Sequence, residues 1–189
     1  MPHPQPSERT QTSYEVRFDW GIEGLRSTAP GAGVIVIVDV LSPDHGRWVA
    51  DASPFGVPVV AADLRNYSAA ARWVLAHQQQ LGRRANVAVI AAGERRGDGT
   101  LRPAVEDQLA AGALVGALAG LGIDACSPEA AVVAASFDAM RRAVGHLLTA
   151  CVSARELAAV DRLDDVAIAA QLDVSDVVPV MRDGVFRAE

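Results

Sequence analysis

Cysteine is scarce in this chain, which has only two in 189 residues. Cys126 and Cys151 are not closely spaced in the sequence with each other, and neither forms a short motif with a histidine. This spacing indicates neither a disulfide framework nor a zinc site. We therefore expect two small thiols that pack as apolar side chains.

Aromatic residues and positive charge are also sparse. Aromatic residues make up 5% of the chain, and 17 Lys and Arg face 23 Asp and Glu, which gives a formal net charge of -6. Neutralising nucleic-acid phosphates requires clustered Lys and Arg, and the sequence contains no such run. We therefore expect no nucleic-acid partner.

Long hydrophobic runs are missing as well. The first twelve residues are polar and contain proline, unlike a secretory signal, and no later stretch has the length of a membrane span. We expect a cytoplasmic protein without a membrane partner, with a flexible tail over residues 1–13 and a single domain over residues 14–189.

Three well-known catalytic motifs are absent from the sequence. It contains no glycine-rich phosphate loop of the Walker type, no G-x-S-x-G elbow and no dinucleotide-binding fingerprint. The sequence therefore gives no support to an ATPase, a serine hydrolase or a nicotinamide oxidoreductase.

Short apolar runs alternate with segments of helical periodicity, a pattern typical of helices packed on a mostly parallel sheet. We predict the α/β class, as a three-layer α/β/α arrangement around a mostly parallel or mixed central sheet. Predicted strands cover residues 14–19, 34–40, 57–61, 86–91 and 177–181, with a short edge piece at 185–186. Predicted helices cover residues 68–81, 104 to 120 or 122, 127–137, 140–151 and a segment beginning near 153.

Carboxylates gather after the strand over residues 86–91. Glu94 follows that strand, and Glu106 and Asp107 fall in the first turn of the next predicted helix. Acids in a first turn also stabilise the helix itself, through its dipole, by about 0.3 to 1 kcal/mol. A structural role is therefore the alternative. Because ligands of open α/β sheets bind at the carboxyl ends of strands, we predict a magnesium site here.

Two further segments are candidates for binding or catalysis. Asp39 ends the apolar run over residues 34–38, where a carboxylate commonly faces a cleft, and His45 lies in the loop that follows. Ser153 and Arg155 lie at a predicted helix start and suit an anion such as a phosphate or sulfonate. Ser153 and Glu156 also fit a capping box, which is the structural alternative.

Together these segments resemble the ComB family of magnesium-dependent 2-phosphosulfolactate phosphatases. The similarity lies in W-G-I-E-G at 20–24, V-I-V-D-V-L at 36–41, L-R-N-Y-S-A-A-A at 64–71, A-A-G-E at 91–94, D-G-T-L-R-P-A-V-E-D at 98–107 and S-A-R-E-L at 153–157. It continues through scattered positions from Asp165 to Phe186.

The resemblance implies hydrolysis of a small anionic phosphate monoester that carries a sulfonate, a step toward coenzyme M. It implies that Glu94, Glu106 and Asp107 hold magnesium, with Asp39 and Glu94 as catalytic residues. It leaves open whether Asp39 or a metal-bound water attacks phosphorus. The substrate-binding residues that it implies are Asn66, Ser153 and Arg155.

The sequence departs from the family pattern at three places. Residues 42–46 read S-P-D-H-G where the family has an arginine, the section over residues 47–63 is short, and Ala154 replaces a glycine. Arg47 or Arg65 is a candidate replacement for the missing cation. The alternatives are a catalytically impaired protein that binds a small anion, or a regulatory or structural subunit. The many Ala and Leu positions on helices would allow a homodimer.

Overall fold

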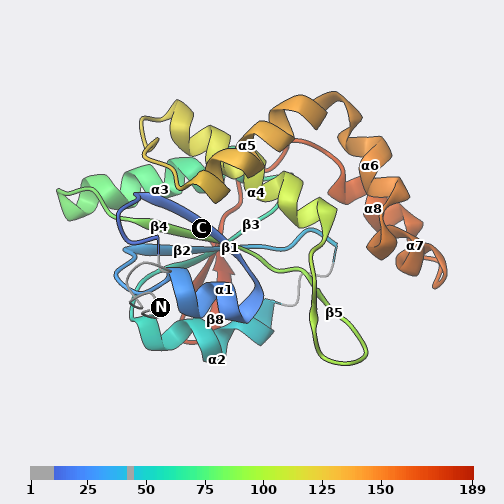
Figure 1. Ribbon diagram of the computed structural model, residues 1–189, viewed down its shortest axis with the longest axis horizontal. Coiled ribbons are helices and arrows are strands. Elements are labelled where there is room, and N and C mark those ends of the chain that lie inside the picture. Colours follow the sequence, from blue (N-terminus) through green and yellow to red (C-terminus); the bar gives the residue numbers. More distant parts are fainter. Residues whose placement is uncertain (1–10, 42–44) are drawn as a thin grey trace, which may run out of the picture.

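A six-stranded sheet forms the centre of the protein in a computed structural model that describes residues 11–41 and 45–189 (Figure 1). The strand order is β1-β4-β2-β3-β7-β8. The first four strands in this order are parallel, and the last two are antiparallel to their neighbours. The strands are β1 (Val16–Trp20), β2 (Val34–Val38), β3 (Val59–Ala62), β4 (Val87–Ala91), β7 (Pro179–Arg182) and β8 (Val185–Ala188).

The central strands are buried on both faces. Every residue of β2, β3 and β4 is buried, as expected for continuous apolar runs in a parallel sheet. Two separate apolar clusters result, one on each face of the sheet. The predicted strands and the mixed, mostly parallel sheet are therefore confirmed.

Helices cover both faces of the sheet, so the predicted three-layer arrangement is also confirmed (Figure 1). One face is covered by α1 (Gly21–Thr28) and α2 (Val49–Ala52). The other is covered by α3 (Tyr67–Leu81), α4 (Val105–Gly120) and α5 (Pro128–Met140). The helices α6 (Val144–Ala150), α7 (Val152–Ala158) and α8 (Leu163–Ala169) extend this second layer beyond the sheet.

Two local predictions need correction. The turn expected after Glu94 is a small hairpin, made of β5 (Glu94–Arg95) and β6 (Leu101–Arg102). The capping box expected at Ser153 is wrong, because α7 begins at Val152, two residues earlier than a cap at Ser153 would allow. Its N-cap is Cys151, whose Sγ accepts a hydrogen bond from the backbone N–H of Ala154 at 3.4 Å.

The predicted tail lies mostly outside the described residues, which begin at Gln11. The Gln11 side chain donates to the Phe18 carbonyl at 2.9 Å and accepts from the Phe18 N–H at 3.0 Å. This pair of bonds attaches residue 11 to β1. In the described part of the chain, no helix has both the length and the apolar character needed to cross a bilayer.

Candidate active site

Asp107 connects three segments at the carboxyl edge of the sheet. Its Oδ1 accepts the backbone N–H of Val40, after β2, at 2.9 Å. Its Oδ2 accepts the backbone N–H of Gly93, after β4, at 2.8 Å. The first turn of α4 is thereby fixed to the ends of two neighbouring strands, where open α/β sheets bind their ligands.

Asp107 belongs to a group of three buried acids, which we call the acid cluster. Asp39, Glu106 and Asp107 are each at most 3% exposed. Burial raises the pKa of Asp107 well above its usual range, the negative charges of Asp39 and Glu106 raise it further, and the two backbone N–H groups oppose the shift. Three carboxyl groups therefore share one buried space.

The Glu106 side chain has one buried oxygen, Oε2, that accepts no hydrogen bond from the described residues. The side chain lies beside the Cys151 thiol, where burial together with the Glu106 charge raises the pKa of Cys151 to about 11. The thiol is therefore protonated at neutral pH, and Oε2 is a ligand atom without a partner in the described structure.

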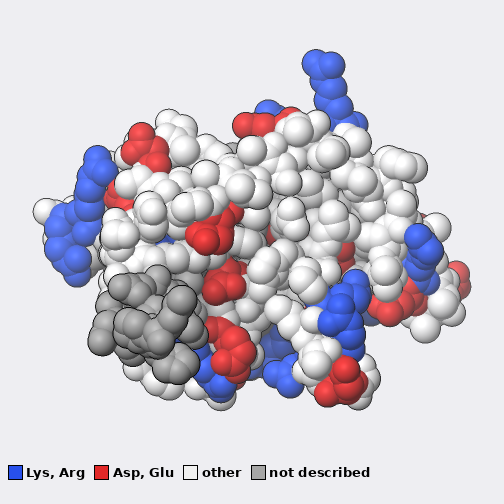
Figure 2. All heavy atoms as spheres, viewed as in Figure 1, with Lys and Arg blue, Asp and Glu red and all other residues white. Residues whose placement is uncertain are grey.

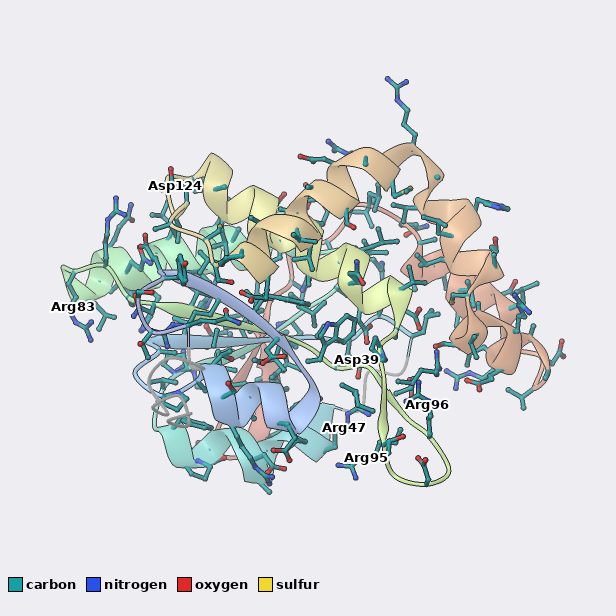
Figure 3. All side chains as sticks on the ribbon, viewed as in Figure 1. Asp39, Arg47, Arg83, Arg95, Arg96 and Asp124 are labelled. Carbon is teal, nitrogen blue, oxygen red and sulfur yellow. The ribbon has the colours of Figure 1, made fainter. Side chains whose placement is uncertain are left out.

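Arg47 supplies positive charge next to this cluster. It lies in the 3-10 helix η2 (His45–Trp48), and its Nη2 donates to Asp39 Oδ2 at 3.0 Å and to the Gly93 carbonyl at 3.3 Å. Figure 3 shows Asp39 and Arg47 next to each other at the edge that also carries Arg95 and Arg96. Arg47 thus places a cation next to Asp39. The side chain of His45 and residues 42–44 lie outside what the structure describes.

The two faces of the hairpin carry different side chains. Glu94 pairs with Arg102 and Arg95 with Leu101, so Glu94 and Arg102 lie on one face of the hairpin and Arg95 and Leu101 on the other. Arg102 donates to Ser153 Oγ at 3.2 Å and lies 3.7 Å from a Glu156 oxygen. Its face of the hairpin is therefore directed toward α7.

Glu94 is half-buried, and within the described part of the chain its carboxylate has no hydrogen bond or ion pair. The predicted metal set of Glu94, Glu106 and Asp107 is not assembled. Across residues 11–41 and 45–189, no group of three or more His, Cys, Asp or Glu side chains is arranged to hold a metal ion. The acid that joins Glu106 and Asp107 in the structure is Asp39.

A smaller set of ligands still suits magnesium. Mg2+ is usually bound by one or two protein carboxylates, with water and substrate oxygens completing its shell. Glu106 has an unpartnered buried oxygen, and each oxygen of Asp107 keeps lone-pair capacity beyond its single N–H bond. These two residues therefore fit the ion, without Glu94.

Asn66 and Arg155 make contacts that serve the fold. The Asn66 side chain accepts the Asp63 N–H at 2.9 Å and donates to the Val177 carbonyl at 3.0 Å, which fixes the loop after β3. Arg155 is exposed and donates through Nε and Nη2 to the Ala150 carbonyl at the end of α6, at 3.2 and 3.0 Å. Neither residue contacts the acid cluster through these bonds. Their predicted role in substrate binding stays a prediction.

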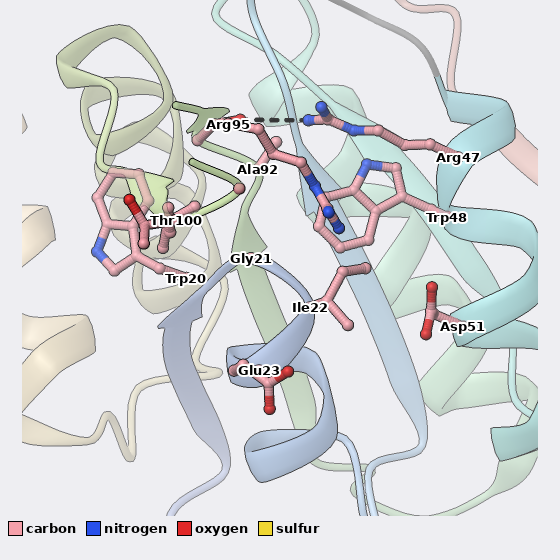
Figure 4. A pocket seen from close by; sticks show the side chains of 13 residues that line it. Trp20, Gly21, Ile22, Glu23, Arg47, Trp48, Asp51, Ala92, Arg95 and Thr100 are labelled. Atoms are coloured by element: carbon pink, nitrogen blue, oxygen red, sulfur yellow. Dashed lines mark hydrogen bonds between the residues drawn. The ribbon is translucent and has the colours of Figure 1, made fainter. Parts of the chain in front are cut away.

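A pocket of about 560 Å3 opens beside Arg47. Figure 4 shows it between the hairpin, the start of α1 and the segment that carries Arg47 and Trp48. Arg47 and Gly93 belong both to the pocket wall and to the contacts of the acid cluster. Over the face drawn in Figure 2, the arginines form separate groups and no continuous basic surface.

Sequence reasoning missed Arg95 and Cys151 and offered Arg47 only as one of two replacements. Arg47 follows a stretch without regular periodicity, so no pattern directed it toward Asp39. Cys151 lies far from Glu106 in sequence. The register of the hairpin puts Glu94 and Arg95 on opposite faces. Its strands are only two residues long, which is too short for this alternation to be recognised in the sequence.

Comparison with known proteins gives one match. No curated protein matches this chain at a significant level. A family model described as 2-phosphosulpholactate phosphatase matches residues 46–184, which is more than half of the chain. The matched range includes Arg47, Glu106 and Asp107, whereas Asp39 precedes it. The chain therefore belongs to the 2-phosphosulpholactate phosphatase family.

Proposed function

We propose that the chain is a magnesium-dependent phosphatase that hydrolyses a small anionic phosphate monoester, with 2-phosphosulfolactate as the first substrate to test. The observation that carries the proposal is the position of Arg47, held by Asp39 and the Gly93 carbonyl next to three buried acids. A cation beside carboxylates at the carboxyl ends of strands suits phosphoryl transfer, which depends mainly on positioning and charge.

Arg47 binds the phosphoryl group in this proposal. One nitrogen of its guanidinium is used by Asp39 and Gly93, and the planar fork offers further N–H donors. A phosphate oxygen that replaces Asp39 as partner of Arg47 would end that ion pair. Asp39 then either attacks phosphorus itself or removes a proton from the attacking water.

Glu106 and Asp107 would hold the magnesium ion, which when bound supplies positive charge to the phosphoryl oxygens. The backbone N–H bonds from Val40 and Gly93 orient the Asp107 carboxylate before any ligand arrives. Glu94 and the pair of Arg102 and Ser153 lie on the other side of the hairpin. The predicted roles of Ser153 in substrate binding and of Glu94 in catalysis stay predictions, because the pocket beside Arg47 lies on the opposite face of the hairpin.

The test is phosphate release from 2-phosphosulfolactate by the purified chain, with Mg2+ and with a chelator. We expect Mg2+-dependent release and a loss of about 100-fold or more in kcat/KM for Arg47→Ala, because the phosphoryl charge loses its cation. Arg83→Ala, in the exposed loop that follows α3, is the matched control and keeps full activity. No release above background from 2-phosphosulfolactate or from any other small anionic phosphate monoester by the unmodified chain would contradict the proposal.

A binding protein without turnover is the second candidate. It is favoured by two departures from the family pattern, the short section over residues 47–63 and the arginine missing from residues 42–46. The two candidates differ in a thermal-shift experiment with Mg2+ and the sulfonate product. A ligand at 100 times its Kd stabilises the folded state by about 2.7 kcal/mol, so a raised Tm without phosphate release would favour binding alone.

A further inference from the structure

The pocket beside Arg47 is larger than a three-carbon acid needs. Its volume of about 560 Å3 lies in the range of roughly 300 to 1,000 Å3 that encloses drug-sized ligands. Because Arg47 and Gly93 line it and also contact the acid cluster, a substrate with its phosphate at Arg47 can extend directly into this space.

The walls of the pocket are mainly apolar. Trp20, Ile22, Trp48 and Leu101 contribute side chains from three different segments. Leu101 is held against two glycines with left-handed backbone. A Cβ added at Gly21 would lie 3.2 Å from Leu101 Cδ1, and one at Gly93 would lie 2.8 Å from it. The wall is therefore built by close packing of the hairpin, and it offers apolar surface to a ligand.

Arg95 is the cation that the pocket offers to a ligand. The two acids in the lining, Glu23 and Asp51, share Arg26, at 2.9 and 3.0 Å, so these three groups together keep one negative charge. Arg47 is paired with Asp39. Within the described part of the chain, Arg95 has no hydrogen bond or ion pair, and Figure 4 shows its side chain extending from the hairpin into the pocket.

We propose that this pocket binds the non-phosphate part of the substrate, and that it selects phosphate monoesters with an apolar group and a carboxylate for Arg95. The inference rests on the proposed phosphatase function and deepens it, because it names a substrate class larger than a three-carbon acid. Arg95 acts as a specificity residue and takes no part in the reaction itself.

The test uses phosphonates, which bind without being hydrolysed, and measures Kd by calorimetry in saturating Mg2+. We expect phenylphosphonate to bind about tenfold or more tightly than methylphosphonate, because its ring buries apolar area in the pocket. Ile22→Trp and Leu101→Trp fill the pocket and remove this difference while methylphosphonate still binds. A second filling variant keeps the test valid if the first does not fold.

A carboxylate on the ring tests Arg95. We expect 4-carboxyphenylphosphonate to bind about three- to fivefold more tightly than phenylphosphonate, the size of an exposed ion pair. Arg95→Gln removes this gain, and Arg83→Gln, with the same change of charge elsewhere, keeps it.

Equal affinity for phenylphosphonate and methylphosphonate overturns the proposal, and so does a carboxylate gain that survives Arg95→Gln. Absence of phosphate release from every ester would overturn the proposed function alone. The phosphonate affinities would then still decide whether the pocket binds as proposed.

Discussion

At the scale of single residues, the buried carboxylate of Asp107 has the most demanding position in the protein. Sequence alone left two interpretations for it, a helix-dipole role in the first turn of α4 or a role in a site. The carboxylate bonds to the N–H groups of Val40 and Gly93, which belong to other segments. Its oxygens therefore join the ends of two strands, whatever the helix dipole adds.

Removal of this carboxylate leaves two backbone donors without partners. We expect Asp107→Ala to lower the free energy of unfolding by about 1 to 3 kcal/mol, because each buried N–H loses its acceptor and only part of the loss is offset by relief of repulsion from Asp39 and Glu106. Chemical denaturation measures the change.

Asp124→Ala is the matched control for this prediction. Asp124 is exposed in the loop before α5, and Figure 3 places it far from Asp39. We expect its substitution to change stability by less than about 0.5 kcal/mol. An Asp107→Ala protein as stable as the Asp124→Ala protein would show that the two backbone bonds contribute nothing.

At the scale of helices and strands, α4 is the element that places the acids, and it packs closely on α5. A Cβ built at Gly112 would overlap the Val133 carbonyl oxygen of α5. Gly116, one helical turn further on, has open space around it. The packing of α4 on α5 therefore requires glycine at position 112 but not at position 116.

These positions give opposite predictions for the same substitution. We expect Gly112→Ala to destabilise the protein by about 1 to 3 kcal/mol, because the helices must move apart. We expect Gly116→Ala to stabilise it by about 0.5 to 1 kcal/mol, because alanine favours the helix and meets no neighbour. Thermal unfolding of both variants measures the effect, and a shift of the same sign in both would contradict the packing argument.

The small hairpin is the element that sequence reasoning did not foresee. Each of its strands has two residues, too few for a period of alternation to be recognised. Its register nevertheless decides that Arg95 faces the pocket, while Glu94 lies on the face of Arg102. Glu94 was predicted as a metal ligand from its position after the strand over residues 86–91, and the structure does not assemble it with Glu106 and Asp107.

At the scale of the whole molecule, the acid cluster makes stability depend on pH. The pKa of Asp107 is raised in the folded state above its unfolded value of about 3.9, mainly by burial. Between these two values the folded chain keeps a proton that the unfolded chain releases. The contribution of Asp107 to the free energy of unfolding therefore decreases as the pH rises from about 4 toward neutrality.

Asp107→Asn isolates this contribution. Asparagine does not titrate, so we expect the stability of the variant relative to the unmodified protein to increase from pH 4 to pH 7 in metal-free buffer. Denaturation curves at several pH values measure the difference. A difference that is constant or decreases with pH would mean that Asp107 is not destabilised by burial.

The sequence by itself determined the layers, the main strands and helices, and the acids and arginines available for a site. These follow from local properties, because runs of Val and Ile and the spacing of apolar residues indicate which segments are buried. The similarity of several segments to one family was also visible in sequence, and the family match bears it out.

Only the tertiary structure decided which of these residues meet. Asp107 and Val40 are 67 positions apart, and no local pattern predicts their hydrogen bond. The pairing of Arg47 with Asp39, the contact of Cys151 with Glu106 and the direction of Arg95 depend in the same way on how separate segments pack. Residue type fixes what chemistry is available, whereas packing fixes which charges share one buried space.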